Sequence, residues 1–230
     1  MKTIGMIGGM SWESTMAYYR WVNEMVQKKL GKLHSLPCLI SSVDFQPLAE
    51  MQHNGDWDKA AAFLGAEAQK LEQSGAEAVM LCTNTMHAVA DQIENAVSIP
   101  LLHIADAASH HVHRHGLTNV VLLGTSFTME QRFYRDRLAS QGIETVIPDA
   151  MARERVHKII FDELCLGITE NASRDYLLDV IHSLVNEGSE GVLLGCTELS
   201  MLLKQSDLSV PLFDTTKMHA GEAVRFALSG

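Results

Sequence analysis

The chain contains 230 residues, of which 47% are hydrophobic and 20% are charged, and its formal net charge at pH 7 is −10. This composition is typical of a well-packed globular protein with one or two domains, and the acidic charge argues against a nucleic-acid partner, which would need a basic surface. The chain has four cysteines and no Cys-x-x-Cys pair, which argues against zinc-ribbon, thioredoxin-type and disulfide-framework proteins.

The amino terminus leads directly from Met1 and Lys2 into a short apolar segment that is soon interrupted by glycine. A secretory signal or a membrane span would need a longer apolar stretch. We therefore expect a cytoplasmic protein with free thiols and without a membrane partner.

Short apolar runs alternate with longer stretches of helical spacing along the whole chain. Strands are predicted over Thr3–Ile7, Pro37–Asp44, Ala78–Leu81, Leu101–His103, Asn119–Leu123, Thr145–Ile147, Gly191–Leu194 and Val210–Phe213. Helices are predicted over Thr15–Lys29, Asp58–Ser74, Met129–Gln141, Arg153–Gly167, Ser173–Glu187 and Met218–Leu228, where apolar residues recur every three or four positions. Most of the strands are apolar on both faces, so the pattern predicts an α/β fold with parallel sheets.

The order of these elements repeats within the chain. The strand, glycine turn and helix of 4–29 correspond to those of 120–141. We therefore predict two similar domains related by a pseudo-twofold, with 1–104 plus 214–230 as the first and 105–213 as the second. Loops at the carboxyl ends of parallel strands build ligand sites, so the sequence predicts an active site in the cleft between the domains.

Two of the predicted strands end in chemically similar ways. Ala78–Leu81 is followed by Cys82 and Thr83, and Gly191–Leu194 is followed by Gly195 and Cys196. Aligning the two segments places Thr83 opposite Cys196. Because neighbouring side chains on a strand point to opposite faces, Thr83 shares its face with Cys196 and Cys82 points into the packing behind. A cysteine near a helix start is expected to have a lowered pKa, which favours a catalytic role for Cys196.

The first strand runs into the glycine-rich turn Gly8-Gly9-Met10-Ser11. The turn lacks the Gly-x-Gly-x-x-Gly pattern and the lysine of a phosphate-binding loop, which argues against a nucleotide. We expect its backbone amides and Ser11 to face a substrate carboxylate at a helix start, although a plain tight turn would use the same glycines.

Histidines form a second pattern. His110, His111, His113 and His115 are clustered, and two of them have helical metal-ligand spacing, but no third ligand is evident nearby, so we interpret the run as a solvated helix face and expect no metal. His87 and His219 lie near predicted helix starts and are weaker candidates, since isolated histidines more often satisfy packing.

Four segments together resemble one enzyme family. They are Gly8–Thr15, Asn84–His87, Gly195–Leu199 and Asp214–Ala220. In this order they resemble the PLP-independent aspartate/glutamate racemase family, and above all its aspartate racemase branch and broad-specificity amino-acid racemases. The resemblance implies two Rossmann-like domains, a homodimer, no cofactor and two catalytic cysteines on opposite faces of the substrate α-carbon. One of these positions is Cys196, and the other falls on Thr83.

The resemblance also implies a set of substrate-binding residues for a small amino acid or dicarboxylate. They are Met10, Ser11, Gln52, Asn84, Thr85, Thr125, Thr128, Thr197 and Glu198. Gln52 stands where members that act on acidic substrates place a cation, so we expect weaker or broader recognition.

The missing second thiol predicts asymmetric chemistry. Cys196 can remove an α-proton, whereas the Thr83 hydroxyl hardly ionises near neutral pH and can only donate or relay a proton. Two alternatives remain open at this point. They are a single-cysteine decarboxylase or isomerase of the same superfamily, and a non-catalytic dicarboxylate-binding relative.

Overall fold

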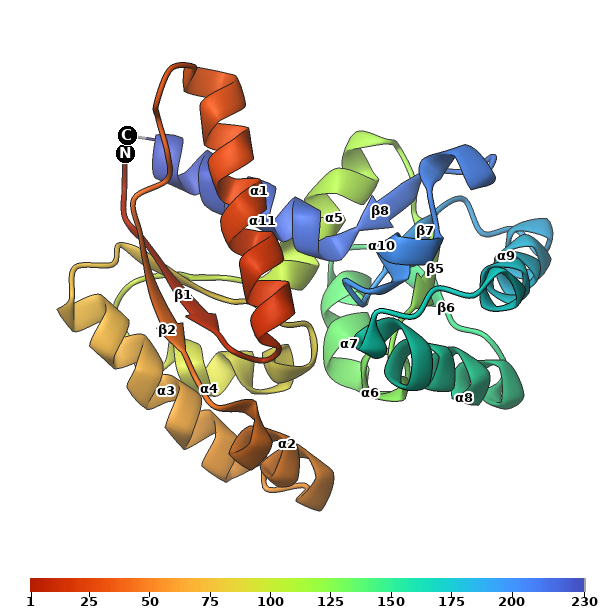
Figure 1. Cartoon of the computed structure of the whole chain (residues 1–230), viewed down its shortest axis with the longest axis horizontal. Coiled ribbons are helices and arrows are strands. Elements are labelled where there is room, and N and C mark those ends of the chain that lie inside the picture. The colour runs from red at the N-terminus through yellow and green to blue at the C-terminus, as the bar shows by residue number, and fades with distance from the viewer. Residues whose placement is uncertain (230) are drawn as a thin grey trace. The chain divides into compact units, whose positions relative to one another are not determined.

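The computed structural model describes residues 1–229 and contains two four-stranded parallel sheets (Figure 1). The first sheet has the order β2-β1-β3-β4, with β1 at Ile4–Gly8, β2 at Cys38–Ser42, β3 at Ala78–Leu81 and β4 at Leu101–Leu102. The second has the order β6-β5-β7-β8, with β5 at Asn119–Leu123, β6 at Glu144–Val146, β7 at Val192–Leu194 and β8 at Leu212–Asp214. The predicted α/β class and all of the predicted strands are confirmed, and the two sheets repeat one strand order.

The contacts within the chain divide it into two compact units. The first unit is Met1–Ile104 with His219–Gly230, and the second unit is Ala105–Met218. The chain re-enters the first unit at His219 and not at Asp214, because β8 pairs with β7 and the hydroxyl of Thr215 donates to the carbonyl oxygen of Leu194 at 2.7 Å.

The helices of the first unit cover both faces of its sheet (Figure 1). They are α1 (Trp12–Leu30), α2 (Phe45–Asn54), α3 (Trp57–Gln73), the 3-10 turn η1 (Thr85–Val89), α4 (Ala90–Glu94) and the greater part of α11 (Thr215–Leu228). Side chains alternate along β3, so that Val79 and Leu81 pack with α3 and α4, while Met80 packs with α1 and α11. This alternation gives the unit one hydrophobic cluster on each side of the sheet.

The second unit repeats the arrangement with more irregular helices. They are α5 (Ile104–Arg114, whose first residue belongs to the first unit), α6 (Ser126–Glu130), α7 (Arg132–Ser140), α8 (Ala150–Lys158), the π turn η2 (Ile159–Glu163), the 3-10 turn η3 (Leu164–Leu166), α9 (Asn171–Asn186), α10 (Leu199–Leu202) and the 3-10 turn η4 (Gln205–Asp207). The helix predicted over 129–141 is broken at Gln131, whose backbone is extended (φ −72°, ψ 140°). The helix predicted over 153–167 changes into the turns η2 and η3 after Lys158.

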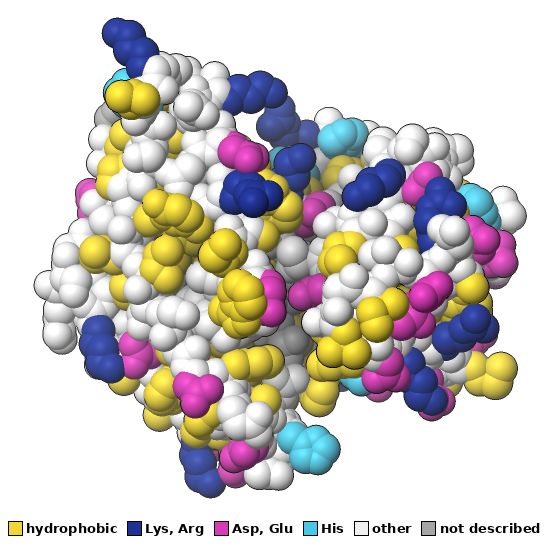
Figure 2. Space-filling model, in the orientation of Figure 1, with side chains coloured by type: hydrophobic (Ala, Val, Ile, Leu, Met, Phe, Trp, Pro, Cys, Tyr) yellow, Lys and Arg dark blue, Asp and Glu magenta, His cyan; other side chains and the backbone are white. Residues whose placement is uncertain are grey.

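Helix α1 is apolar on two faces, of which one is buried. Tyr18 and Val22 lie in the core of the first unit, whereas Trp12, Met16 and Tyr19 are exposed. Figure 2 shows hydrophobic side chains gathered over this helix and its surroundings. Among residues 1–229, no helix is both long enough and apolar enough to cross a membrane.

Candidate active site

The carboxyl ends of β3 and β7 carry the residues that the sequence singles out. Thr83 lies two residues after the end of β3, and Cys196 lies two residues after the end of β7. Because the two sheets have the same strand order, these positions are equivalent in their units. We call 83–85 the first half-site and 196–198 the second half-site.

Cys82 lies on the other side of the first sheet. Its side chain is fully buried in the cluster that also holds Met80 and Tyr18, and burial raises the pKa of its thiol. The Cys82 carbonyl oxygen accepts a hydrogen bond from the hydroxyl of Ser14 at 3.2 Å. The alternation of side chains therefore excludes this thiol from the edge that carries Thr83, as the sequence predicts.

The second half-site pairs its thiol with a carboxylate. Sγ of half-buried Cys196 donates a hydrogen bond to Oε2 of Glu198 at 2.9 Å. Burial, followed by the negative charge of Glu198, raises the pKa of the Cys196 thiol well above its ordinary value. The expectation of a lowered pKa is therefore wrong for the free protein, since α10 has only four residues and begins beyond the thiol, at Leu199.

Residues at the start of α11 complete this edge. The hydroxyl oxygens of Thr197 and Thr216 lie 3.3 Å apart, and β8 places Asp214 beside Leu194. Burial raises the pKa of the Asp214 carboxyl. Sequence reasoning missed Thr216 and Asp214 as parts of the half-site, although strand order alone places the end of β8 beside the end of β7.

The first half-site is built around a short turn. Thr83 and Thr85 are half-buried, and Asn84 is 8% exposed and precedes the 3-10 turn η1. His87, in η1, is buried, and its Nδ1 lies 2.8 Å from the carbonyl oxygen of Thr83. The buried histidine therefore contacts the backbone of the half-site.

His219 is also buried within the first unit. Its Nε2 lies 2.6 Å from the carbonyl oxygen of Leu102, and its Nδ1 lies 2.9 Å from the hydroxyl of Tyr18. Both ring nitrogens are thus occupied by protein groups. His219 is therefore a packing residue with satisfied hydrogen bonds, which is the weaker role that the sequence allowed for it.

Two hydrogen bonds join the glycine turn to the first turn of α1. The amide of Gly9 donates to Oγ1 of Thr15 at 2.8 Å, and the amide of Ser14 donates to Oγ of Ser11 at 3.3 Å. Ser11 is therefore the N-cap of α1. Among the amides of the turn, that of Gly9 is therefore already paired with Thr15 and is not available to a substrate carboxylate.

Gly9 is required by the close approach of the neighbouring loop. Its φ is +91°, and a Cβ atom would lie 2.1 Å from the carbonyl oxygen of Val43. We expect Gly9→Ala to lower the free energy of unfolding by about 3 kcal/mol or more, through backbone strain and steric overlap. Urea denaturation of the purified variant measures this change.

Gly55→Ala is the matched control for this substitution. Gly55 also has a positive φ of +74°, but no atom lies within 4 Å of the position that a Cβ atom would take. We expect this variant to lose only about 1 to 2 kcal/mol, the cost of the left-handed conformation alone. Equal losses in the two variants would contradict the importance of the contact with Val43.

The remaining predicted binding residues differ in accessibility. The side chain of Met10 is 4% exposed and packs in the hydrophobic cluster under α3, and Thr128 is 1% exposed. A Cβ atom on Gly195 would lie 2.9 Å from Cγ2 of Thr128, so this threonine supports the loop before the second half-site. Packing occupies both side chains, and the assignment of Met10 and Thr128 to the substrate-binding residues stays a prediction.

Thr125 and Gln52 occupy helix ends. Thr125 is the N-cap of α6, where its Oγ1 accepts from the amide of Thr128 at 3.4 Å. Gln52 is half-buried in α2, and its carbonyl oxygen accepts from the amide of Gly55. Helix α2 follows the end of β2, so Gln52 belongs to a helix that leaves the carboxyl edge of the first sheet.

Two of the clustered histidines, one in α5 and one directly after it, contact backbone carbonyl oxygens. Nδ1 of His111 lies 2.9 Å from the carbonyl oxygen of Ala107, and Nδ1 of His115 lies 2.9 Å from that of His111. Over residues 1–229, no group of three or more His, Cys, Asp or Glu side chains is arranged to hold a metal ion.

Comparison with known proteins gives a consistent result over nearly the whole chain. A family model described as Asp/Glu/hydantoin racemase matches residues 7–223. The chain is 24% identical over 227 residues to the broad specificity amino-acid racemase RacX of Bacillus subtilis (strain 168), with 96% of each chain covered. It superposes with a TM-score of 0.97 on a Yersinia pestis protein described as a candidate Asp/Glu racemase, with 50% identity and 100% of both chains covered. An aspartate racemase homologue from Pyrococcus horikoshii OT3 gives a TM-score of 0.90, with 36% identity and 99% of both chains covered.

Proposed function

The chain belongs to the Asp/Glu/hydantoin racemase family, whose amino-acid racemases are isomerases, and from this premise we propose that it is a cofactor-independent racemase of aspartate- or glutamate-like amino acids. The observation that carries the proposal is the matched pair of strand ends, because Thr83 and Cys196 hold equivalent places after β3 and β7. We propose that the two half-sites act on opposite faces of one substrate α-carbon.

Cys196 is the proposed base, and Glu198 is its proton acceptor. In the free protein the thiol is protonated and donates to the Glu198 carboxylate. In the proposed reaction the thiol proton moves to Oε2 of Glu198, and the resulting thiolate removes the α-proton of the substrate. The electron pair of the broken C–H bond is delocalised into the substrate carboxylate, where hydrogen-bond donors stabilise the developing charge.

Thr83 acts on the other face as a donor and not as a base. Its hydroxyl stays protonated near neutral pH, so it can return a proton to the carbanion only by relay, with a water or a neighbour replacing the proton it gives. We propose that removal of the α-proton is fast only for the enantiomer that presents this proton to Cys196. A true racemase still balances forward and reverse reactions at equilibrium.

The substrate is held by neutral donors. Asn84, Thr85 and Thr197 offer an amide and hydroxyls at the two strand ends, and Gln52 offers an amide without positive charge. We propose that recognition of the side-chain carboxylate is correspondingly weak and the substrate range broad. The homodimer and the cytoplasmic location that were expected from the sequence remain predictions.

Hydrogen exchange at the α-carbon tests the proposed function directly. Each enantiomer of aspartate and glutamate is incubated with the protein in D2O, and deuterium incorporation and chiral inversion are followed by mass spectrometry and chiral chromatography. We expect exchange of one enantiomer to exceed inversion. Equal exchange and inversion rates from both enantiomers would overturn the one-sided mechanism, and no exchange with any common amino acid would overturn the racemase proposal.

Replacing Glu198 by glutamine separates two roles of the carboxylate. If Glu198 only raised the pKa of the Cys196 thiol, its removal would increase the thiolate fraction and speed α-hydrogen exchange. If Glu198 accepts the thiol proton, Glu198→Gln slows exchange, and we expect a decrease of about 10²-fold. Exchange rates of the parent and the variant, measured across pH 6 to 9, decide between the two roles. Faster exchange in the variant would contradict proton transfer from Cys196 to Glu198.

A second candidate function follows from the single thiol. Cys196 is the one thiol of the two half-sites, and one thiol suffices to protonate an enolate after decarboxylation of a malonate-type substrate. Product analysis with substituted malonates and with amino acids separates the two reactions. Loss of carbon dioxide from a malonate, without exchange of amino-acid α-hydrogens, would favour the decarboxylase.

A further inference from the structure

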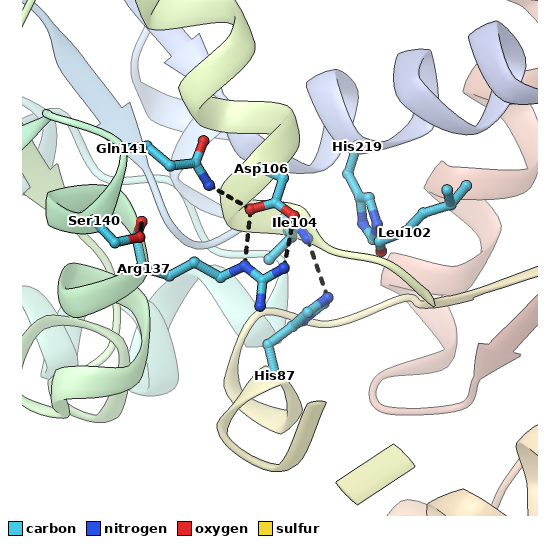
Figure 3. A network of polar contacts seen from close by, with 8 residues as sticks. All are labelled: His87, Leu102, Ile104, Asp106, Arg137, Ser140, Gln141 and His219. Carbon is cyan, nitrogen blue, oxygen red and sulfur yellow. Dashed lines mark hydrogen bonds and ion pairs between the residues drawn. The ribbon is translucent and has the colours of Figure 1, made fainter. Parts of the chain in front are cut away.

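A buried histidine joins the first half-site to the helix at which the chain leaves the first unit. His87 is 2% exposed, with Nδ1 2.8 Å from the carbonyl oxygen of Thr83 and Nε2 3.2 Å from the backbone nitrogen of Ile104. Ile104 is the first residue of α5, and Figure 3 shows the His87 ring directed at it. The imidazole therefore accepts from a backbone amide that the helix itself leaves unpaired.

The two partners fix which ring nitrogen of His87 carries the proton. A carbonyl oxygen only accepts and a backbone amide only donates, so Nδ1 of His87 is protonated and Nε2 is not. A second proton on Nε2 would point at the amide of Ile104. His219 has the opposite tautomer, because its Nε2 donates to the carbonyl oxygen of Leu102 and its Nδ1 accepts from the hydroxyl of Tyr18.

The surroundings of His87 favour the neutral ring. Its ring centroid lies 4.6 Å from that of His103 and 5.5 Å from that of His219, and Tyr18 lies against His219. Burial, followed by these two histidines, lowers the pKa of His87 well below its ordinary value. The positive end of the α5 dipole acts in the same direction.

We propose that His87 is a positioning residue, which holds the backbone of Thr83 in place relative to the backbone of Ile104 and does so only as the neutral tautomer with its proton on Nδ1. This inference rests on the proposed function, because it assigns Thr83 a place beside the substrate. Thr83 is the weaker of the two proton carriers, so its reaction depends most strongly on placement.

Helix α5 is also held by an ion pair within the second unit. The carboxylate of Asp106, on the first turn of α5, accepts from Arg137 at 2.8 and 2.7 Å and from Gln141 at 2.6 Å (Figure 3). Ser200 follows Cys196 by four residues, as His87 follows Thr83. Its hydroxyl donates to the carbonyl oxygen of Thr197, at 2.7 Å, within the second half-site. A histidine that links the end of the strand to the first residue of a later helix is thus found at the first half-site and not at the second.

Two substitutions separate the two hydrogen bonds of His87. The asparagine side chain ends near the position of Nδ1, so His87→Asn retains a donor for the carbonyl of Thr83 and loses the acceptor for Ile104. The glutamine side chain reaches the position of Nε2, so His87→Gln retains the acceptor for Ile104 and loses the donor. His111 is the matched control, because its Nδ1 also contacts the carbonyl oxygen four residues before it, that of Ala107, at 2.9 Å.

Inversion and exchange respond differently if His87 positions Thr83. Exchange of the enantiomer that faces Cys196 needs no proton transfer by Thr83, whereas inversion needs proton transfer at both half-sites. We expect both His87 variants to lower inversion by about 10- to 100-fold while this exchange stays within about 2-fold, with the larger effect in His87→Gln. The same changes at His111 should leave both rates within about 2-fold. A parent-like ratio of inversion to exchange in both His87 variants would overturn the positioning role.

Nitrogen-15 NMR of histidine-labelled parent protein tests the tautomers without any assay of activity. We expect His87 to be protonated on Nδ1 and His219 on Nε2, and His87 to stay neutral at pH 6, where exposed histidines are more than half protonated. Because the pKa of His87 is lowered on folding, its contribution to stability is full above about pH 6.5 and falls as the pH decreases below that value. A His87 ring protonated on Nε2 at neutral pH would overturn the inference. If the parent shows no exchange at all, the proposed function fails, and this measurement still decides the arrangement of the histidine.

Discussion

Cys196→Ala is expected to lower α-hydrogen exchange by about 10³- to 10⁴-fold, equivalent to ~4 to 5.5 kcal/mol of transition-state stabilisation. The thiol is the only group of the second half-site that can become a strong carbon base near neutral pH, since Thr197 bears a hydroxyl and Glu198 a weakly basic carboxylate. The measurement is deuterium incorporation into each enantiomer of aspartate and glutamate. Substrate binding, followed by calorimetry, should change much less than the exchange rate.

Cys82→Ala is the matched control for this variant. Cys82 lies at the other strand end but is fully buried among apolar side chains. Its replacement should cost about 1 kcal/mol of stability and leave exchange within about 2-fold. If a folded Cys196→Ala protein kept exchange within 10-fold of the parent, or if Cys82→Ala lost it, the assignment of the base would be wrong.

The α/β class and the two strand ends could be predicted because they depend on local rules. Buried parallel strands are apolar on both faces, and alternation of side chains alone separates Thr83 from Cys82. Helix α2 was not predicted, although its signals are present. Asp44 caps its first turn and Gly55 ends it in the left-handed conformation, but only Leu48 within the helix is buried, so its apolar periodicity is weak.

The electrostatic state of the site could not be predicted from the same rules. The pKa of Cys196 depends first on the burial of the thiol and then on the side chain of Glu198 folding back onto it, and neither is specified by sequence spacing. The hydrogen bonds of the buried histidines join residues that are distant along the chain. His219 contacts the carbonyl of Leu102 and the hydroxyl of Tyr18, which only the folded first unit brings together.

Thr83→Cys is expected to give the first half-site a base of its own. The substitution exchanges a hydroxyl for a thiol at a half-buried position, and it leaves the backbone carbonyl that His87 binds. A thiol ionises far more readily than a hydroxyl, so the enantiomer that exchanges slowly in the parent should exchange at least about 10²-fold faster. Deuterium incorporation into the two enantiomers, measured separately, gives this ratio.

Thr83→Val shows whether the hydroxyl itself matters, because valine keeps the branched shape of threonine without a proton to donate. If Thr83 relays a proton, inversion falls in Thr83→Val while exchange of the enantiomer facing Cys196 persists. If Thr83 only packs, Thr83→Val resembles the parent. Gain in Thr83→Cys together with loss in Thr83→Val would mean that both strand ends serve one α-carbon. Parent-like rates in both variants would mean that the equivalence of Thr83 and Cys196 is topological and has no chemical role, and the single thiol would then favour the decarboxylase.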